Sequence, residues 1–161
     1  MDENQTTLAE YKETFSSTLQ GDTVQFEAQP AVTPEGLAPG IAYRYIVGSF
    51  EAVADFQDSP TTAAGISPVI TMDVKGPEDE FALVFEGFIE VPEDGMYTFY
   101  TESNDGSRLF IDGNEVVEND GLHRAETRAG IVALKKGLHA LEVKYFQAGM
   151  RSAFEVYWSG P

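Results

Sequence analysis

The chain has 161 residues, 42% of them hydrophobic and 12% aromatic, which is enough for one domain with a sizeable core, or one domain and a fragment of a neighbour. Its 27 acidic residues against 10 Lys and Arg give a formal charge of −17, so nucleic acid and anionic membranes are excluded as favoured partners. The sequence lacks cysteine, an apolar run long enough to cross a bilayer and a signal peptide, so we expect neither thiol chemistry nor membrane insertion.

Residues 1–29 differ in composition from the rest of the chain. The segment 6–29 predicts two strands about the turn "QGD", and residues 8–15 are also compatible with a short helical turn. Three prolines and two glycines in residues 30–40 predict a stiff linker or an extended lead-in. We expect residues 30–161 to form the main domain, and residues 1–29 to be either its N-terminal edge strands or the remnant of a preceding domain.

The dominant hydrophobic period of the chain is two. In residues 81–91 the large apolar side chains fall on one face of an extended strand, and Glu86 and Glu90 fall on the other. Short segments of strand character follow, separated by turns: 96–102, 108–111, 115–118, 130–134, 139–146 and 152–158. Regularly spaced short strands predict an all-β fold, an antiparallel β-sandwich or barrel.

Several polar and aromatic residues have a sufficient structural explanation. Asp112-Gly113 between apolar strands predicts a tight hairpin turn, so we assign Asp112 no functional role. His139 alternates inward with its apolar neighbours and is expected to be a buried sheet residue. We expect Tyr157 and Trp158, in the last strand, to pack in the core. Chance carboxylate pairs are unavoidable among 27 acidic residues and no nucleophile motif occurs, so we do not expect an enzyme.

Three stretches carry a family resemblance: "FEGFIEVPEDGMYTFYTESNDGSRLFIDGNEVVENDG", "ALKKGLHALEVKYFQAG" and "FEVYWSGP". In this order they resemble the PA14 family, over residues 40–161, and residues 121–161 look most like the modules appended to secreted bacterial glycosidases such as β-hexosaminidases. The resemblance implies an antiparallel β-sandwich of PA14 type that serves as a non-catalytic carbohydrate-binding module. It also implies an extracellular, periplasmic or cell-surface location, and neighbouring domains in the same parent chain.

The resemblance also implies a calcium site. In the calcium-binding PA14 adhesins, two consecutive aspartates joined by a cis peptide hold the ion with an asparagine and nearby carbonyl groups. The matching positions here are Asn104, Asp105, Gln147 and the backbone carbonyls of Gly149 and Arg151. Asparagine in place of one aspartate removes a negative charge, which weakens calcium binding without excluding it. The alternative is that "NDGS" is a plain turn whose side chains bond the local backbone.

The glycan ligand is expected at the same loops. If the hairpin of the strands 108–111 and 115–118 goes up and down once, the turn that follows lies at the same end of the sandwich. The predicted carbohydrate-binding residues are therefore Asn104, Asp105, Asp120, His123 and Gln147. The alternative is a structural or interface domain that packs against a catalytic neighbour and binds no sugar, because no loop offers an obvious stacking aromatic.

Overall fold

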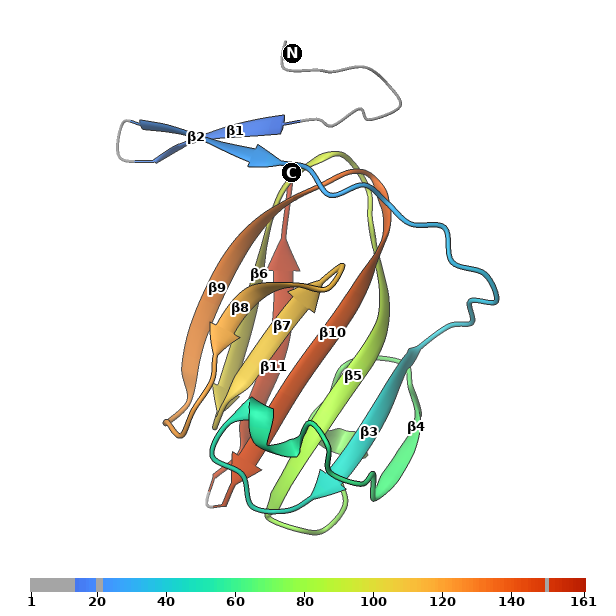
Figure 1. The fold of residues 1–161 in the computed structure, drawn as a ribbon, viewed down its shortest axis with the longest axis vertical. Helices are drawn as coiled ribbons and strands as arrows, with labels where there is room; N and C mark the ends of the chain where they lie inside the picture. The colour runs from blue at the N-terminus through green and yellow to red at the C-terminus, as the bar shows by residue number, and fades with distance from the viewer. Residues whose placement is uncertain (1–13, 20–21, 150) are drawn as a thin grey trace.

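The computed structural model describes residues 14–19, 22–149 and 151–161, and side chains from Ala28 onward. Two antiparallel sheets face each other, which confirms the all-β sandwich (Figure 1). The six-stranded sheet has the order β4 (Ala63–Ser67), β3 (Ile41–Val47), β5 (Glu80–Val91), β10 (Gly137–Ala148), β7 (Ser107–Ile111), β8 (Asn114–Asn119). The three-stranded sheet has the order β11 (Ala153–Ser159), β6 (Gly95–Asn104), β9 (Glu126–Leu134). Within the described residues no helix has the length and apolar character needed to cross a membrane.

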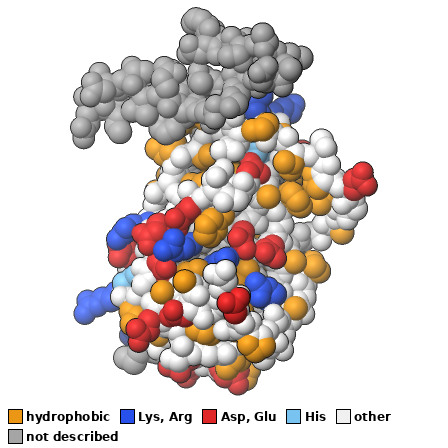
Figure 2. Space-filling view, in the orientation of Figure 1, with side chains coloured by type: hydrophobic (Ala, Val, Ile, Leu, Met, Phe, Trp, Pro, Cys, Tyr) orange, Lys and Arg blue, Asp and Glu red, His pale blue; other side chains and the backbone are white. Residues whose placement is uncertain are grey.

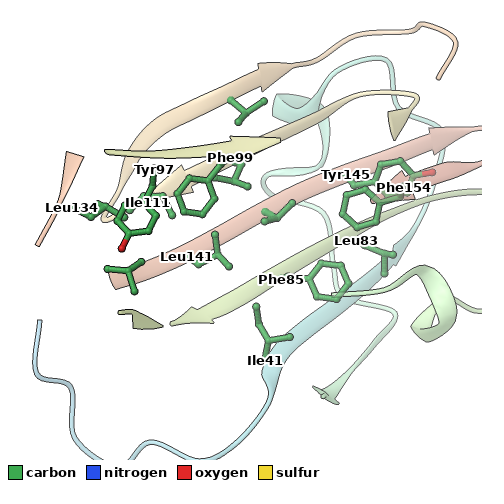
Figure 3. Packing of buried hydrophobic residues seen from close by; sticks show 14 of the residues in the cluster. Ile41, Leu83, Phe85, Tyr97, Phe99, Ile111, Leu134, Leu141, Tyr145 and Phe154 are labelled. Carbon is green, nitrogen blue, oxygen red and sulfur yellow. The ribbon is translucent and has the colours of Figure 1, made fainter. Parts of the chain in front are cut away.

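The core lies between the two sheets and follows the predicted alternation. Leu83 and Phe85 of β5 are fully buried, as are the inward residues of β7 and β10. The rings of Tyr145 on β10 and Phe154 on β11 stack with centroids 4.4 Å apart, which joins one sheet to the other (Figure 3). Each fully buried large apolar side chain contributes about 1.5–3 kcal/mol to the free energy of folding.

A second, smaller core covers the outer face of the six-stranded sheet. Strand alternation would turn Ala82, Val84 and Phe146 toward solvent, but all three are buried. The turn η1 (Val53–Phe56) folds over them, and the ring of Phe56 lies 6.4 Å from that of Phe146. The sequence did not indicate this layer, because the connection that supplies it has no regular period.

The N-terminal segment forms the predicted hairpin. β1 (Thr14–Leu19) pairs antiparallel with β2 (Asp22–Glu27); the alternative helical turn over 8–15 lies mostly outside the described residues. The lead-in then pairs with the sandwich, because Gln29 N donates to Ala133 O at 2.8 Å and Val32 N donates to Leu138 O at 2.9 Å. The domain boundary at residues 29 and 30 stays a prediction.

The last strand corrects one expectation. The Tyr157 side chain is 43% exposed and stacks on Tyr100 outside the core, with 4.8 Å between the ring centroids. Trp158 packs on Tyr97 and Phe99 but is 39% exposed. Core packing is therefore wrong for Tyr157 and only partly correct for Trp158, because β11 is an edge strand and Tyr157 faces away from the second sheet.

We expect Gly130→Ala to destabilise the sandwich strongly. A Cβ atom at Gly130 in β9 would lie 1.7 Å from the carbonyl oxygen of Val116 in β8, so strand backbone has to move. Overpacking of this kind costs about 1–3 kcal/mol in the free energy of unfolding, measured by urea denaturation. Ala129→Ser, at the exposed neighbouring position, is the control and should change little. An unchanged midpoint for Gly130→Ala would contradict the close approach of the two strands.

We expect Glu142→Gln to stabilise the protein near neutral pH. Glu142 lies opposite Glu86 across β10 and β5; burial and the hydrogen bond with Glu86 raise the pKa of Glu142, against the lowering effect of Lys144 and Arg44. Because the pKa of Glu142 is raised in the folded state, its protonated form stabilises the protein at acid pH. This stabilisation is lost as the pH rises through the folded-state pKa of Glu142. Relief of a like-charge cross-strand pair is worth about 0.2–1 kcal/mol.

The thermal midpoint, compared at about pH 7 and about pH 4, is the readout for Glu142→Gln. The gain should be present at the higher pH and disappear at the lower one. Glu90→Gln is the matched control, because Glu90 on β5 lies opposite Leu138 and not opposite a carboxylate. Equal effects of the two substitutions would show that the Glu86–Glu142 pair is not the cause.

Candidate functional site

The carboxylate of Asp105 ties together three connections at one end of the sandwich, the lower end in Figure 1. Its Oδ1 accepts from the backbone N–H of His123 at 3.1 Å, and its Oδ2 accepts from that of Ala148 at 2.9 Å. The β6–β7, β8–β9 and β10–β11 connections therefore meet here. We name this the loop end. The prediction that the turn after residue 119 returns to the "NDGS" loop is confirmed.

The "NDGS" loop is more than a plain turn. The peptide bond between Asn104 and Asp105 is cis. Asp105 N donates to Phe146 O at 3.1 Å and Phe146 N donates to Gly106 O at 3.0 Å, so the loop continues alongside β10. A Cβ atom on Gly106 would lie 2.6 Å from the Phe146 ring and 2.7 Å from the Gly121 nitrogen. Only glycine fits between these two contacts.

Tyr145 of β10 stabilises the "NDGS" loop through a hydrogen bond. Its hydroxyl donates to the backbone carbonyl of Asn104 at 2.8 Å. Burial raises the pKa of Tyr145, and the negative charge of Asp105 raises it further, so the hydroxyl keeps its proton and remains a donor. The sequence indicated an inward-facing strand residue here, and gave no sign of this second role.

Gln147 closes the cage that the sequence assigned to calcium. Its side chain is 1% exposed, and its amide nitrogen donates to the carbonyls of Gly149 and, at 3.0 Å, Arg151. Both predicted carbonyl ligands therefore already have a donor, as do both oxygens of Asp105. Within the part of the chain that the structure describes, no group of three or more His, Cys, Asp or Glu side chains is placed to hold a metal. Calcium takes about six to eight oxygen ligands, and a single carboxylate with two carbonyls that already accept hydrogen bonds fits it poorly.

Asp120 is engaged elsewhere. Its Oδ1 accepts from Val53 N at 2.9 Å and from Gly121 N at 2.8 Å, and its Oδ2 accepts from Arg108 Nε at 3.0 Å. Arg108 also pairs with Glu115, and Figure 2 shows blue and red side chains side by side on this face. Asp120 does not line the pocket at the loop end. Its position explains how η1 is held over the sheet, and it does not support a carbohydrate contact.

The loop end carries an open pocket of about 720 Å³. Of the residues predicted from sequence, it is lined by Asn104, Asp105, His123, Gly149 and Arg151. Four further lining residues were not predicted: Leu122, Arg124, Ala125 and Ala148. Gln147 lies beneath the pocket and does not line it. The pocket combines an apolar side chain that is 55% exposed, Leu122, with an amide and two guanidinium groups.

The ring of His123 is engaged with the backbone of its own loop. Its Nδ1 lies 2.7 Å from Arg124 O and its Nε2 lies 2.8 Å from Asn119 O. Both oxygens are acceptors, so the ring donates a hydrogen bond to at least one of them, which holds the β8–β9 connection in shape. His123 therefore positions the pocket wall. The expectation for the other histidine is confirmed: buried His139 has its ring nitrogens 2.7 Å from Asp112 Oδ2 and 2.8 Å from Lys135 O.

The chain is similar to known proteins in sequence and in fold. The PA14 domain family model matches residues 42–161. A β-hexosaminidase of Porphyromonas gingivalis (strain ATCC BAA-308 / W83) is 25% identical over 130 residues, which cover 75% of this chain but only 16% of the enzyme. The PA14 sugar-binding domain from an RTX adhesin superposes with a TM-score of 0.64 at 18% identity, covering 77% of this chain and 91% of that one. A subtype-switched epithelial adhesin 9 A domain from Candida glabrata, in complex with β-lactose, superposes with a TM-score of 0.62 at 10% identity, covering 83% and 86%.

We expect calcium to leave the melting temperature of the wild-type protein unchanged, and to raise that of the double variant Asn104→Asp, Gln147→Asn. The variant supplies a second carboxylate at position 104. It also shortens the side-chain amide at position 147, which in the wild type donates hydrogen bonds to the carbonyls of Gly149 and Arg151. A bound ion stabilises the native state by about 2.7 kcal/mol at a hundredfold excess over its Kd. The variant in chelator is the control, and a calcium-dependent rise in the wild type would contradict the poor fit.

Proposed function

Because the chain belongs to the PA14 domain family, we propose that it is a non-catalytic carbohydrate-binding module whose glycan site is the pocket at the loop end. The observation that carries this proposal is the pocket itself, formed by three connections that the Asp105 carboxylate holds together. Sugar sites are concave and combine apolar contact with a few placed polar groups. The relatives that are described as sugar-binding or as bound to β-lactose support this choice.

The pocket residues divide into contacts and supports. The Asn104 side chain has no hydrogen-bond partner among the described residues and lines the pocket, so its amide is available to donate to one hydroxyl and accept from another. Exposed Leu122 offers an apolar surface for the C–H face of a sugar ring. Asp105, His123 and Gln147 act beneath these groups, by fixing the shape of the loops.

The same geometry supports binding over catalysis. Canonical glycoside hydrolysis needs two carboxyl groups, about 5–9.5 Å apart, that are free to exchange protons or attack. Asp105 is the single carboxylate that lines this pocket, and both of its oxygens already accept backbone hydrogen bonds. Since the chain corresponds to 16% of its β-hexosaminidase relative, we infer that it accompanies catalytic domains in a secreted or surface-attached bacterial glycoside-processing protein.

A second candidate function is that of an interface domain without sugar binding. An open groove of about 490 Å³ on the side of the sandwich is lined by the exposed side chains of Val69, Phe88 and Trp158. Contiguous exposed apolar surface of this kind favours contact with another protein surface. A catalytic neighbour in the same parent chain is the partner that this candidate requires.

A glycan array, run once with calcium and once with chelator, tests the proposed function. We expect binding to a defined set of glycans, and Asn104→Ala should weaken it about tenfold, the equivalent of one lost hydrogen bond in a polar pocket. Asn114→Ala is the control, because exposed Asn114 follows the β7–β8 turn, away from the pocket. If a folded sample binds no glycan on the array, the result would favour the interface function.

A further inference from the structure

The pocket at the loop end is locally positive, in a protein with a formal charge of −17. Arg124 and Arg151 both line it and are both exposed. Neither guanidinium group has an ion pair or hydrogen bond with any described residue. Arg108 and Arg128, by comparison, pair with carboxylates at 2.7 Å. Two unpaired arginines at one pocket are notable where acidic residues outnumber basic ones 27 to 10.

Asp105 forms no ion pair with Arg124 or Arg151 among the described residues. Its side chain is 8% exposed, and its oxygens accept from the backbone N–H groups of His123 and Ala148 instead. The residues lining the pocket therefore include two arginines and one aspartate, and both oxygens of that aspartate already accept backbone hydrogen bonds. A cation would meet positive charge in this pocket, and an anion would meet two donors without partners.

We propose that the pocket binds a carboxylated sugar residue, and that Arg124 and Arg151 hold its carboxylate without calcium. This inference rests on the proposed carbohydrate-binding function. A guanidinium group presents paired N–H donors that match the two oxygens of a carboxylate, and such charge-assisted bonds are stronger than neutral ones. Leu122 and the free amide of Asn104 supply contacts for the rest of the ring.

The charge of the whole protein narrows the ligand further. A long, densely charged polyanion would be repelled by the acidic surface outside the pocket. At physiological ionic strength the screening length is about 8 Å, so a single carboxylate in the pocket is governed mainly by the two arginines beside it. The site therefore favours a glycan with one or a few carboxylates over a heavily sulfated polymer or a nucleic acid.

Neutral donors contact the positions that the family resemblance assigned to calcium ligands. The Gln147 amide nitrogen donates to the carbonyls of Gly149 and Arg151, and two backbone N–H groups donate to Asp105. The loops are thus held in place without an ion. A ligand that brings its own negative charge completes the pocket electrostatically, whereas a neutral sugar leaves both arginines unpaired.

Paired probes that differ only in the carboxylate or its residue test the proposal: an oligogalacturonate and its methyl ester, and sialyllactose and lactose. We expect the acidic member of at least one pair to bind better, by about tenfold for each arginine engaged, in chelator as in calcium. Arg124→Gln and Arg151→Gln should each remove about tenfold of that preference, with unchanged melting temperatures because both side chains are exposed. Affinity should fall as salt is added.

The control is Arg128→Gln, which makes the same change in net charge at a residue that pairs with Glu126 and does not line the pocket. An equal loss in this control would assign the preference to overall charge and overturn the proposal. So would equal or tighter binding of the neutral members, or a requirement for calcium, and these results would leave the proposed carbohydrate function standing. Failure of every glycan, neutral or acidic, to bind would overturn both.

Discussion

The carboxylate of Asp105 is the contact on which the loop end depends. It is nearly buried, and each oxygen accepts a backbone N–H from a different connection. A buried carboxylate is stable only when its charge is met by donors, and here the donors are main-chain groups of loops far apart in sequence. The hydrogen bonds that satisfy the charge of Asp105 therefore hold three connections close together around one pocket.

The carbonyl groups at the loop end meet the same requirement with an amide donor. Carbonyl oxygens that converge at a loop end need a positive or donor group between them. In this protein the amide of Gln147 reaches the carbonyls of Gly149 and Arg151 from beneath. The positive charge at the pocket surface is carried by Arg124 and Arg151, both of which are exposed.

Sequence alone predicted the features that depend on local pattern. The period-two alternation in β5 identified the inner core, and the hairpin at Asp112-Gly113 is present, with left-handed φ values of 52° and 83°. Buried His139 was also placed correctly. The alternation failed for Tyr157, since period two distinguishes two faces of a strand but does not say which face the second sheet covers.

The candidate site could be predicted only in part. Family motifs located Asn104 and Asp105, which do line the pocket, but the partners of Asp120 lie 12 and 67 positions away at Arg108 and Val53. Hydrogen bonds over such separations leave no periodic signal. Arg124 was overlooked for a related reason: the sequence gives no sign that an exposed loop arginine lacks a carboxylate partner among the residues the structure describes.

By itself, the alternation and turn pattern of the sequence determined an antiparallel all-β fold, a sandwich or a barrel, with polar turns at the strand ends, because these signals act between near neighbours. The resemblance to the PA14 family selected the sandwich. Only the tertiary structure decided which of those turns meet, and which charges at their meeting point are satisfied. Asp105 finds two backbone donors there, while Arg124 and Arg151 find no carboxylate among the described residues. Charge balance in a pocket is a property of distances between loops, and those distances exist only after the sheets have packed.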